Sequence, residues 1–474
     1  MAPKQALFLF RRDLRLPDNT TLIQAIKDGY KVLPVFIFPP EQIDPKKNPY
    51  FSHPAVQFMC ESLEDLHQSL QTVGSRLHYF KGDNLAVLKR IHQAFPFDAV
   101  YSNQDYSVYS TQRDQSLQEW CDKKGIPFLQ KEDYGLLPLR EGLVENERPY
   151  LILSQFYKKF QAQYQVRPVD RYKYSSESFA THSFPFEYTQ SLHSLYVPPP
   201  SPAIHGGRTQ GLLMLERIKT LKDYQEKRDY PALEKTSKAS PHLKFGTVSI
   251  REMYERVRSL YGPSHGLIRE LVFRDFYMKI YALRPSLQRG KALYHKLDQA
   301  IPWSYHKKNF QAWKEGLTGF PLVDAGMREL NTTGHQHNRI RMLCGSVLTK
   351  YLLIDWRWGL QYYYTHLVDA DIYSNTAGWG FVSSTGPDGV PYFRAPFNPF
   401  IQSKKFDKEA EYIKRWVPEL AEVPPKDIHK WFDPTIREKY ASVTSYPAPI
   451  VDHKEASARA IEVFKGAFAD KYST

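Results

Sequence analysis

The first 130 residues alternate between short apolar runs and longer amphipathic segments, and this alternation restricts the fold more than any other feature. We predict buried strands over the apolar runs at 6–10, 31–38, 76–80, 98–102 and 126–130. We predict helices over the amphipathic segments near 18–28, 53–73, 84–94 and 111–124. Strands that alternate with helices form βαβ units, so this region should be a parallel, doubly wound sheet. Such a sheet offers a ligand crevice at the carboxyl ends of its strands.

The loop after the first predicted strand reads RRDLRLPDN and contains no G-x-G-x-x-G pattern. Those glycines let a backbone approach the pyrophosphate of a dinucleotide at a helix N-terminus. We therefore do not expect a Rossmann-type dehydrogenase.

Two further regions follow the predicted sheet. Residues 131–204 are irregular and rich in Tyr and Pro, with some helix near 149–163, which indicates a connector that wraps a domain interface. Helical patterning then continues to residue 474. The predicted fold class is therefore α/β. An N-terminal doubly wound parallel-sheet domain over 1–130 is followed by an interdomain connector over 131–204 and a larger all-helical domain over 205–474.

The chain carries a formal net charge of +13, which favours a polyanionic partner, nucleic acid first. The interval 244–291 holds ten Lys or Arg residues against four Asp or Glu residues. It is the best local candidate for a surface that contacts the phosphate backbone. The alternative is an ordinary solvated basic helix face.

The cysteine content and the hydropathy of the chain indicate its cellular compartment. Only Cys60, Cys121 and Cys344 are present, without the spacing of metal ligands, so we expect neither a disulfide framework nor a metal site. The sequence shows no leader and no apolar run of about 18 residues, the length that suits a membrane span. We expect a monomer with no membrane partner, located in the cytoplasm, with the nucleus also open if the chain is eukaryotic.

Polar and aromatic side chains gather in residues 331–399. Asn338 and Met342 are four residues apart, so a helix presents them on one face, with Arg339 beside it. Further along the segment come Asp355, Trp356, Asp369, Asp371, Asn375 and Trp379. Upstream, the segment ELVFRDFY places four side chains on one helical face, namely Glu270, Phe273, Arg274 and Tyr277. These residues suit the wall of a large aromatic cofactor site, and the alternative is a Trp-rich helical core with solvated acids.

The blocks HNRIRM, LLIDWRWG, DADIYSNTAGWG and PYFRAPFNP resemble the signature motifs of the photolyase/cryptochrome flavoprotein family. The likeness extends from FRRDLRLPDN to YPAPIVDHKEA, and within the family it is greatest to class I cyclobutane pyrimidine dimer photolyases. The resemblance implies an enzyme, a deoxyribodipyrimidine photo-lyase, that binds FAD and acts on UV-damaged DNA.

The resemblance also implies which residues bind FAD. The motif TSKAS would hold the pyrophosphate, Asn375 would face ring nitrogen N5, and Arg341 would lie near the isoalloxazine, paired with Asp369. The matching cofactor-binding positions are Tyr224, Thr236, Ser237, Lys238, Ala239, Ser240, Glu270, Arg274, Tyr277, Asn338, Arg341, Asp369, Ala370, Asp371 and Asn375.

Three more groups of positions follow from the resemblance. Trp379, Trp356 and Trp303 match the tryptophans that connect the flavin with the surface by electron transfer. The catalytic positions are Glu270, Asn338, Met342 and Asn375. The DNA-binding positions are Arg228, Glu270, Phe273, Asn338, Arg339, Met342, Phe381, Arg394 and Gln402.

Some positions depart from the family pattern. Phe273 and Phe381 stand where class I photolyases usually have tryptophan, and His335 replaces a common aromatic of the pocket rim. Thr111 stands where a glutamate would anchor a folate antenna, which leaves a deazaflavin, another second chromophore or none. The functional hypotheses are a light-driven DNA repair lyase, a blue-light-sensing cryptochrome without repair activity, and a flavin-independent DNA-binding protein.

Overall fold

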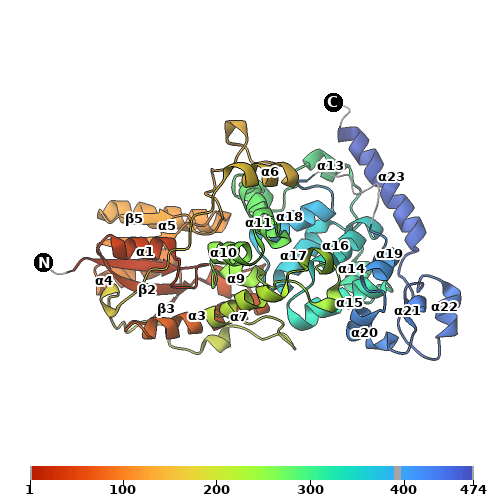
Figure 1. Cartoon of the computed structure of the whole chain (residues 1–474), viewed down its shortest axis with the longest axis horizontal. Coiled ribbons are helices and arrows are strands. Elements are labelled where there is room, and N and C mark those ends of the chain that lie inside the picture. Colours follow the sequence, from red (N-terminus) through yellow and green to blue (C-terminus); the bar gives the residue numbers. More distant parts are fainter. Residues whose placement is uncertain (1–2, 389–396, 472–474) are drawn as a thin grey trace.

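The computed structural model describes residues 3–388 and 397–471, and a parallel sheet lies at one end of the molecule (Figure 1). Its strand order is β3-β2-β1-β4-β5. The strands are β1 (Gln5–Phe10), β2 (Lys31–Phe38), β3 (His78–Lys81), β4 (Ala99–Asn103) and β5 (Phe128–Lys131). Leu7 of β1 pairs with Leu33 and Val100 on its two sides, and all three are fully buried. Both faces of the central strands are covered, which is why the strands are continuous apolar runs.

Helices connect these strands and bury their apolar faces against the sheet. They are α1 (Thr20–Lys27), α2 (Pro40–Ile43), α3 (His53–Gln71), α4 (Asn84–Ala94) and α5 (Val108–Lys124). Four of them begin where a side-chain oxygen accepts a hydrogen bond from a first-turn amide; these capping residues are Asn19, Ser52, Asp83 and Ser107. The predicted parallel α/β region is confirmed, with every predicted strand and helix within a few residues of its expected place, and the short helix α2 was not predicted.

The connector returns to the sheet rather than extending into solvent. The Ala180 amide donates to the Val32 carbonyl over 2.9 Å, and the Tyr188 amide donates to the Tyr79 carbonyl over 2.7 Å. Phe184 is buried against the apolar side chains of the sheet. The connector contains α6 (Leu153–Gln163), η1 (Glu145–Glu147), η2 (Ser176–Ser178) and η3 (Leu192–Leu195). The residue boundaries of the three predicted regions stay a prediction.

The rest of the described chain is helical. Its first half contains α7 (Arg208–Arg217), η4 (Ile218–Thr220), α8 (Tyr224–Lys227), η5 (Pro231–Leu233), α9 (Ser240–Phe245), α10 (Ile250–Tyr261), α11 (Gly266–Ala282), α12 (Pro285–Gln288), α13 (His295–Ala300) and α14 (Lys307–Glu315). Its second half contains α15 (Pro321–Thr333), α16 (Asn338–Ser346), the π-helical turn η6 (Val347–Tyr351), α17 (Trp356–His366), α18 (Ile372–Val382), α19 (Pro399–Phe406), α20 (Glu411–Trp416), η8 (Pro418–Leu420), α21 (Pro425–Ile428), α22 (Pro434–Lys439) and α23 (His453–Lys471).

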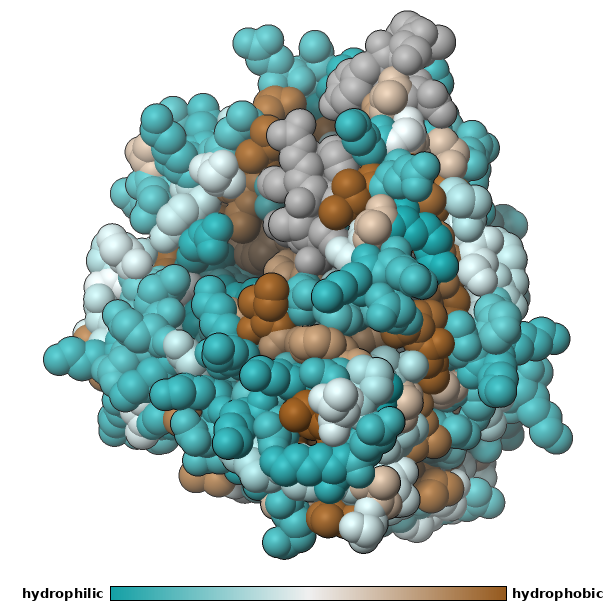
Figure 2. Space-filling view, turned by 90° about the vertical axis from the view of Figure 1, so that its right-hand side faces the viewer, coloured by the Kyte–Doolittle hydropathy of each residue, from teal (hydrophilic) through white to brown (hydrophobic). Residues whose placement is uncertain are grey.

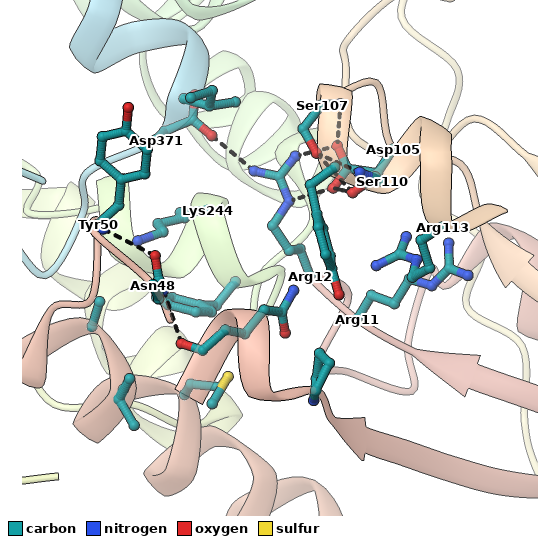
Figure 3. A pocket seen from close by; sticks show the side chains of 18 of the residues that line it. Arg11, Arg12, Asn48, Tyr50, Asp105, Ser107, Ser110, Arg113, Lys244 and Asp371 are labelled. Atoms are coloured by element: carbon teal, nitrogen blue, oxygen red, sulfur yellow. Dashed lines mark hydrogen bonds and ion pairs between the residues drawn. The ribbon is translucent and has the colours of Figure 1, made fainter. Parts of the chain in front are cut away.

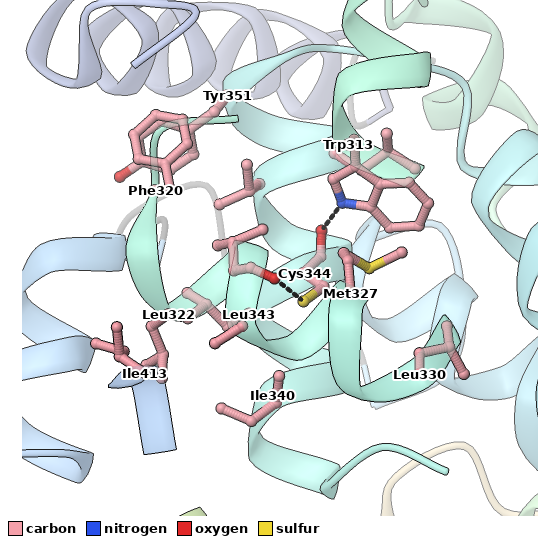
Figure 4. Close-up of a cluster of buried hydrophobic side chains, with 14 of the residues drawn as sticks. Trp313, Phe320, Leu322, Met327, Leu330, Ile340, Leu343, Cys344, Tyr351 and Ile413 are labelled. Carbon is pink, nitrogen blue, oxygen red and sulfur yellow. Dashed lines mark hydrogen bonds between the residues drawn. The ribbon is translucent and has the colours of Figure 1, made fainter. Parts of the chain in front are cut away.

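A dense apolar core fixes the helices that carry most of the predicted site. Trp313 is fully buried, and its indole N–H donates to the Cys344 carbonyl over 3.0 Å (Figure 4). The Cys344 thiol in turn donates to the Val323 carbonyl of α15. Burial raises the pKa of that thiol far above its usual range, so Cys344 acts as a packing residue. These contacts lock α14, α15 and α16 together.

Buried ion pairs join the sheet region to the helical region. Arg251 of α10 is 3% exposed, and its guanidinium contacts Asp18 and Asp133 at 2.7 and 2.6 Å. Lys279, 2% exposed, donates to the Pro138 and Leu139 carbonyls. The charge count alone suggested that the basic interval 244–291 contacts a phosphate backbone. Arg251 and Lys279 of this interval instead hold the two regions together.

The end of the molecule farthest from the sheet presents mainly hydrophilic side chains, with hydrophobic ones gathered beside a hollow (Figure 2). Across residues 3–388 and 397–471, no helix combines the length and apolar character needed to cross a bilayer. The same residues contain no cluster of three or more His, Cys, Asp or Glu side chains arranged for a metal ion.

Candidate functional site

A cavity of about 490 Å3 opens among α8, α9, α11, α16 and α18, and almost every predicted cofactor residue lines it. This volume lies within the usual range for ligand sites. The predicted face of α11 lies on the cavity wall, which is lined by Glu270, Phe273, Arg274 and Tyr277. The other predicted residues that line it are Tyr224, Arg228, Thr236, Ser237, Lys238, Ala239, Ser240, His335, Asn338, Arg339, Arg341, Met342, Asp369, Asp371, Asn375, Trp379 and Phe381.

The segment before α9 forms one end of the cavity. Lys238 adopts a φ of 53°, the left-handed region that an L-residue enters only at a local cost. This turn brings Ser237, Ala239 and Ser240 to the cavity wall. The Ser240 hydroxyl donates to Asp369 Oδ2 over 2.5 Å. The hydroxyls and amides of this segment suit anionic oxygens such as those of a pyrophosphate.

An ion pair lies at the inner wall. Arg341 Nη2 lies 3.0 Å from Asp369 Oδ2, so the predicted pairing is present. Burial acts to raise the pKa of Asp369, but Arg341 and the Ser240 hydroxyl outweigh it and hold that pKa at about 2. The carboxylate is therefore charged at neutral pH and can receive further donors from a ligand.

Several buried polar atoms around the cavity have no hydrogen-bond partner among the described residues. They are Asp369 Oδ1, Asn375 Nδ2 and His337 Nε2. Buried polar atoms are nearly always satisfied in folded proteins, and these belong to residues that line one cavity, so the site suits a polar ligand. The residues present fit FAD, which offers a ring with hydrogen-bonding edges, ribityl hydroxyls and a pyrophosphate.

Arginines and aromatic side chains lie elsewhere on the cavity wall. Arg228 forms an ion pair with Glu270, and Arg339 contacts Asp229 at 2.8 Å. Phe273 packs against Tyr277, with the two rings tilted and their centroids 4.5 Å apart. This wall combines guanidinium groups with apolar faces, the two features that single-stranded or flipped-out bases require.

The predicted relay starts at the cavity. Trp379 lines it and packs against Gly359 of α17, where any side chain would collide with the indole ring. Trp356, the first residue of α17, is 1% exposed, and Trp303 is partly exposed. The indole N–H groups of Trp356 and Trp303 both donate to Asp298 Oδ1, over 3.0 and 3.1 Å. Sequence reasoning missed Asp298, because a single acid on a short helix has no distinguishing pattern.

A second cavity of about 320 Å3 lies at the carboxyl ends of β1 and β2, where the sheet meets the helical region (Figure 3). Arg12 spans it and contacts Asp105 at 2.7 Å and Asp371 at 2.9 Å. The buried Nη2 atoms of Arg11 and Arg113 have no partner within the described part of the chain. Burial lowers the pKa of Arg11, and neighbouring Arg113 lowers it further, so an anion would be favourable here.

Two residues, Lys244 and Asp371, line both cavities. Ala370, predicted for the FAD site, lines the second cavity. Thr111 is exposed on α5, outside the walls of both cavities. Gln402 lies on α19 and does not line the first cavity, and Arg394 lies outside the described residues.

The fold and the larger cavity define a two-region flavoprotein with an α/β sheet and a helical FAD-binding part. Family models match accordingly: "DNA photolyase" over residues 6–173 and "FAD binding domain of DNA photolyase" over residues 267–466. A deoxyribodipyrimidine photo-lyase of Alkalihalophilus pseudofirmus is 35% identical over 96% of this chain and 97% of its own. One of Halobacterium salinarum is 32% identical over 98% of this chain and 100% of its own.

Solved structures agree. The chain superposes with TM-score 0.84 and 37% identity on an archaeal photolyase of Sulfolobus tokodaii that holds two FAD molecules, covering 98% of this chain and 100% of that one. A bacterial class III photolyase of Agrobacterium tumefaciens gives TM-score 0.88 at 31% identity, covering 99% and 98%. The chain belongs to the photolyase/cryptochrome family and is an FAD-binding enzyme of its DNA photolyase branch. The family prediction is confirmed, and the class I assignment stays a prediction.

Proposed function

We propose that this enzyme is a deoxyribodipyrimidine photo-lyase that repairs cyclobutane pyrimidine dimers in UV-damaged DNA under light. The observation that carries the proposal is that one cavity joins the unsatisfied polar atoms suited to a flavin with a wall suited to bases. Reduced FAD, when bound, supplies one electron to the dimer after absorbing blue or near-ultraviolet light and regains it when the dimer has split. We also expect the monomeric state and the cytoplasmic location predicted from the sequence.

The protein groups position and stabilise the reactants. Asp369 and Arg341 would hold the flavin, and the free amide N–H of Asn375 would face its ring. Asn338 and Met342 are on the same face of α16, with the amide 3.9 Å from the thioether sulfur, and would contact the dimer. Photolyases are themselves among the enzymes for which extrusion of the target base from the duplex is the rule.

The direct test uses UV-irradiated DNA incubated with the reduced protein, in blue light and in the dark. We expect dimer counts to fall only in light and only with the reduced flavin present. Unchanged counts in light, with flavin bound and reduced, would contradict repair and favour a cryptochrome, the alternative that Phe273 and Phe381 support. The match to the FAD-binding family model argues against the flavin-independent DNA-binding hypothesis.

The two phenylalanines should limit substrate affinity. The exchanges Phe273→Trp and Phe381→Trp enlarge the stacking face offered to the extruded bases, and base–aromatic stacking contributes about 1 to 3 kcal/mol per base. We expect the double variant to bind a dimer-containing oligonucleotide about three- to tenfold more tightly in the dark. An undamaged oligonucleotide of the same sequence serves as the control and should bind unchanged. If the double variant bound the damaged and the undamaged oligonucleotide more tightly by the same factor, the new indole rings would not contact the lesion.

The second cavity would hold a second chromophore. Both Arg11 and Arg113 pair with Asp114, but their Nη2 atoms have no partner within the described residues and suit a flavin nucleotide with a phosphate. The Sulfolobus tokodaii relative holds two FAD molecules, which supports this choice over a folate. A phosphate-free deazaflavin would leave these two Nη2 atoms without a partner.

Binding in the second cavity should weaken at alkaline pH. Burial lowers the pKa of Lys244 to about 8, against the opposing effect of Asp371 and Asp369. The ammonium group is charged below that pH and attracts an anion, and it loses this charge as the pH rises. We expect FMN affinity to fall by up to about tenfold between about pH 7 and about pH 9. There are two controls: the riboflavin affinity of the wild type, since riboflavin lacks the phosphate, and the FMN affinity of the Lys244→Met variant. If either affinity fell over the same pH range, the assignment to Lys244 would be contradicted.

A further inference from the structure

One carboxylate oxygen contacts two members of the tryptophan relay at once. Asp298 Oδ1 accepts the indole N–H of Trp356 over 3.0 Å and that of Trp303 over 3.1 Å. The same Trp303 N–H also lies 3.1 Å from the Asp298 backbone carbonyl. Asp298 is 8% exposed, so water screens its charge little.

The other carboxylate oxygen is held in place. Arg357 forms an ion pair with Asp298 Oδ2, and the same guanidinium contacts Asp355 at 3.1 Å. Arg357 also donates to the Gly290 carbonyl over 2.9 Å. Oδ2 is therefore held by the cation, while Oδ1 faces the two indoles and also lies 3.5 Å from Arg357 Nη1.

The two indoles are unequal in exposure. Trp356 is 1% exposed, whereas Trp303 is partly exposed and follows α13 on the chain. Removing one electron from an indole puts a positive charge on the ring and makes its N–H strongly acidic. A negative oxygen about 3 Å from that N–H both stabilises the charge and can receive the proton.

We propose that Asp298 stabilises the positive charge on the outer two tryptophans of the relay and accepts the indole proton of Trp303. This inference rests on the proposed electron relay and extends it to a residue that the family resemblance did not supply. Asp298 is a proton-accepting and positioning residue, since it contacts neither substrate nor flavin cavity.

With oxidised FAD bound and excited by light, Trp379 would supply one electron to it, Trp356 would supply one to Trp379, and Trp303 would supply one to Trp356. Trp303 is then a radical cation. Its Nε1–H bond breaks and an O–H bond forms at Asp298 Oδ1, which leaves a neutral indolyl radical and a protonated carboxyl. A thiolate in solution supplies the missing electron and becomes a thiyl radical, and the proton returns from Asp298 to Trp303.

The experiment is flash photolysis of the protein with oxidised FAD bound, followed by visible absorption that separates the tryptophan radical cation from the neutral radical. Asp298→Asn retains the size and an acceptor oxygen but removes the charge and the basicity. We expect its cation-to-neutral conversion to slow at least about tenfold and the yield of long-lived radical to fall several-fold. The matched control is Asp355→Asn, which removes the other carboxylate on Arg357 and should stay within about twofold of the wild type.

A second measurement needs no variant. Infrared difference spectra of the wild type should show a protonated carboxyl band that appears together with the neutral radical and disappears with it. Repair by chemically reduced Asp298→Asn protein should equal that of the wild type, because repair does not use the relay. The role of Asp298 would be overturned if the Asp298→Asn variant converted the radical cation to the neutral radical at the wild-type rate. It would also be overturned if the wild type formed the neutral radical without the carboxyl band. A wild-type protein without any tryptophan radical would instead overturn the relay itself.

Discussion

Arg341→Ala should purify with little or no bound flavin. The guanidinium lies 3.0 Å from Asp369 Oδ2, and the Asp369 side chain is only 3% exposed. Removing one partner of a buried, hydrogen-bonded charge pair costs about 2 to 4 kcal/mol, because the other charge stays buried and unpaired. That cost is a loss of about 30- to 1,000-fold in FAD affinity. Flavin absorbance per mole of protein and a titration of apoprotein with FAD measure it.

The neighbouring Arg339 provides a matched control on the same helix. It pairs with Asp229 and lies 4.8 Å over the Phe406 ring, on the wall that we assign to DNA. Arg339→Ala should keep its full flavin content. Its DNA affinity should fall, and the slope of log affinity against log salt should decrease by about one. Loss of flavin from both variants would show a general weakening of α16 and would contradict the division between the two arginines.

The different roles of the two arginines follow from the family resemblance and stay a prediction, since periodicity alone places only Arg339 beside the face of Asn338 and Met342. Periodicity does account for the face of α11, where a spacing of three and four residues places Glu270 and Arg274 on one wall of the cavity. Local periodicity is a reliable guide when the partners are a few positions apart. The strands of the sheet were predictable for the same reason, as each is a short apolar run.

Contacts between distant segments could not be read from the sequence. Arg251 looked like a DNA contact in a charge count, yet it is buried against Asp18, which lies 233 positions earlier. Asp298 meets Trp356 across 58 positions, and Arg11 meets Asp114 across 103. Only the fold brings such residues together, so the second cavity and the carboxylate of the relay became visible only in the structure.

Asn375→Asp should nearly abolish repair at neutral pH while the protein keeps its flavin. The Asn375 amide nitrogen is buried at the cavity wall and has no partner within the described residues, so it is free to donate to the reduced flavin ring. A carboxylate there removes the donor and adds a negative charge beside an anionic ring, close to Asp369 and Asp371. Like charges in a buried site oppose each other by several kcal/mol, so we expect repair at least about 100-fold slower.

The pH dependence of repair by this variant distinguishes the effect of the added negative charge from the effect of the changed side-chain shape. Burial and the nearby acids should raise the pKa of the new carboxyl, so the neutral form returns as the pH falls. Repair by pre-reduced Asn375→Asp protein should therefore increase from about pH 8 to about pH 6, whereas Asn375→Leu, which has neither charge nor donor, should show a smaller and pH-independent loss. Dimer counts after a fixed dose of blue light give both profiles. An aspartate variant as active as the wild type at about pH 8 would place Asn375 away from the flavin ring, and the electron donor would then have to lie elsewhere in the cavity.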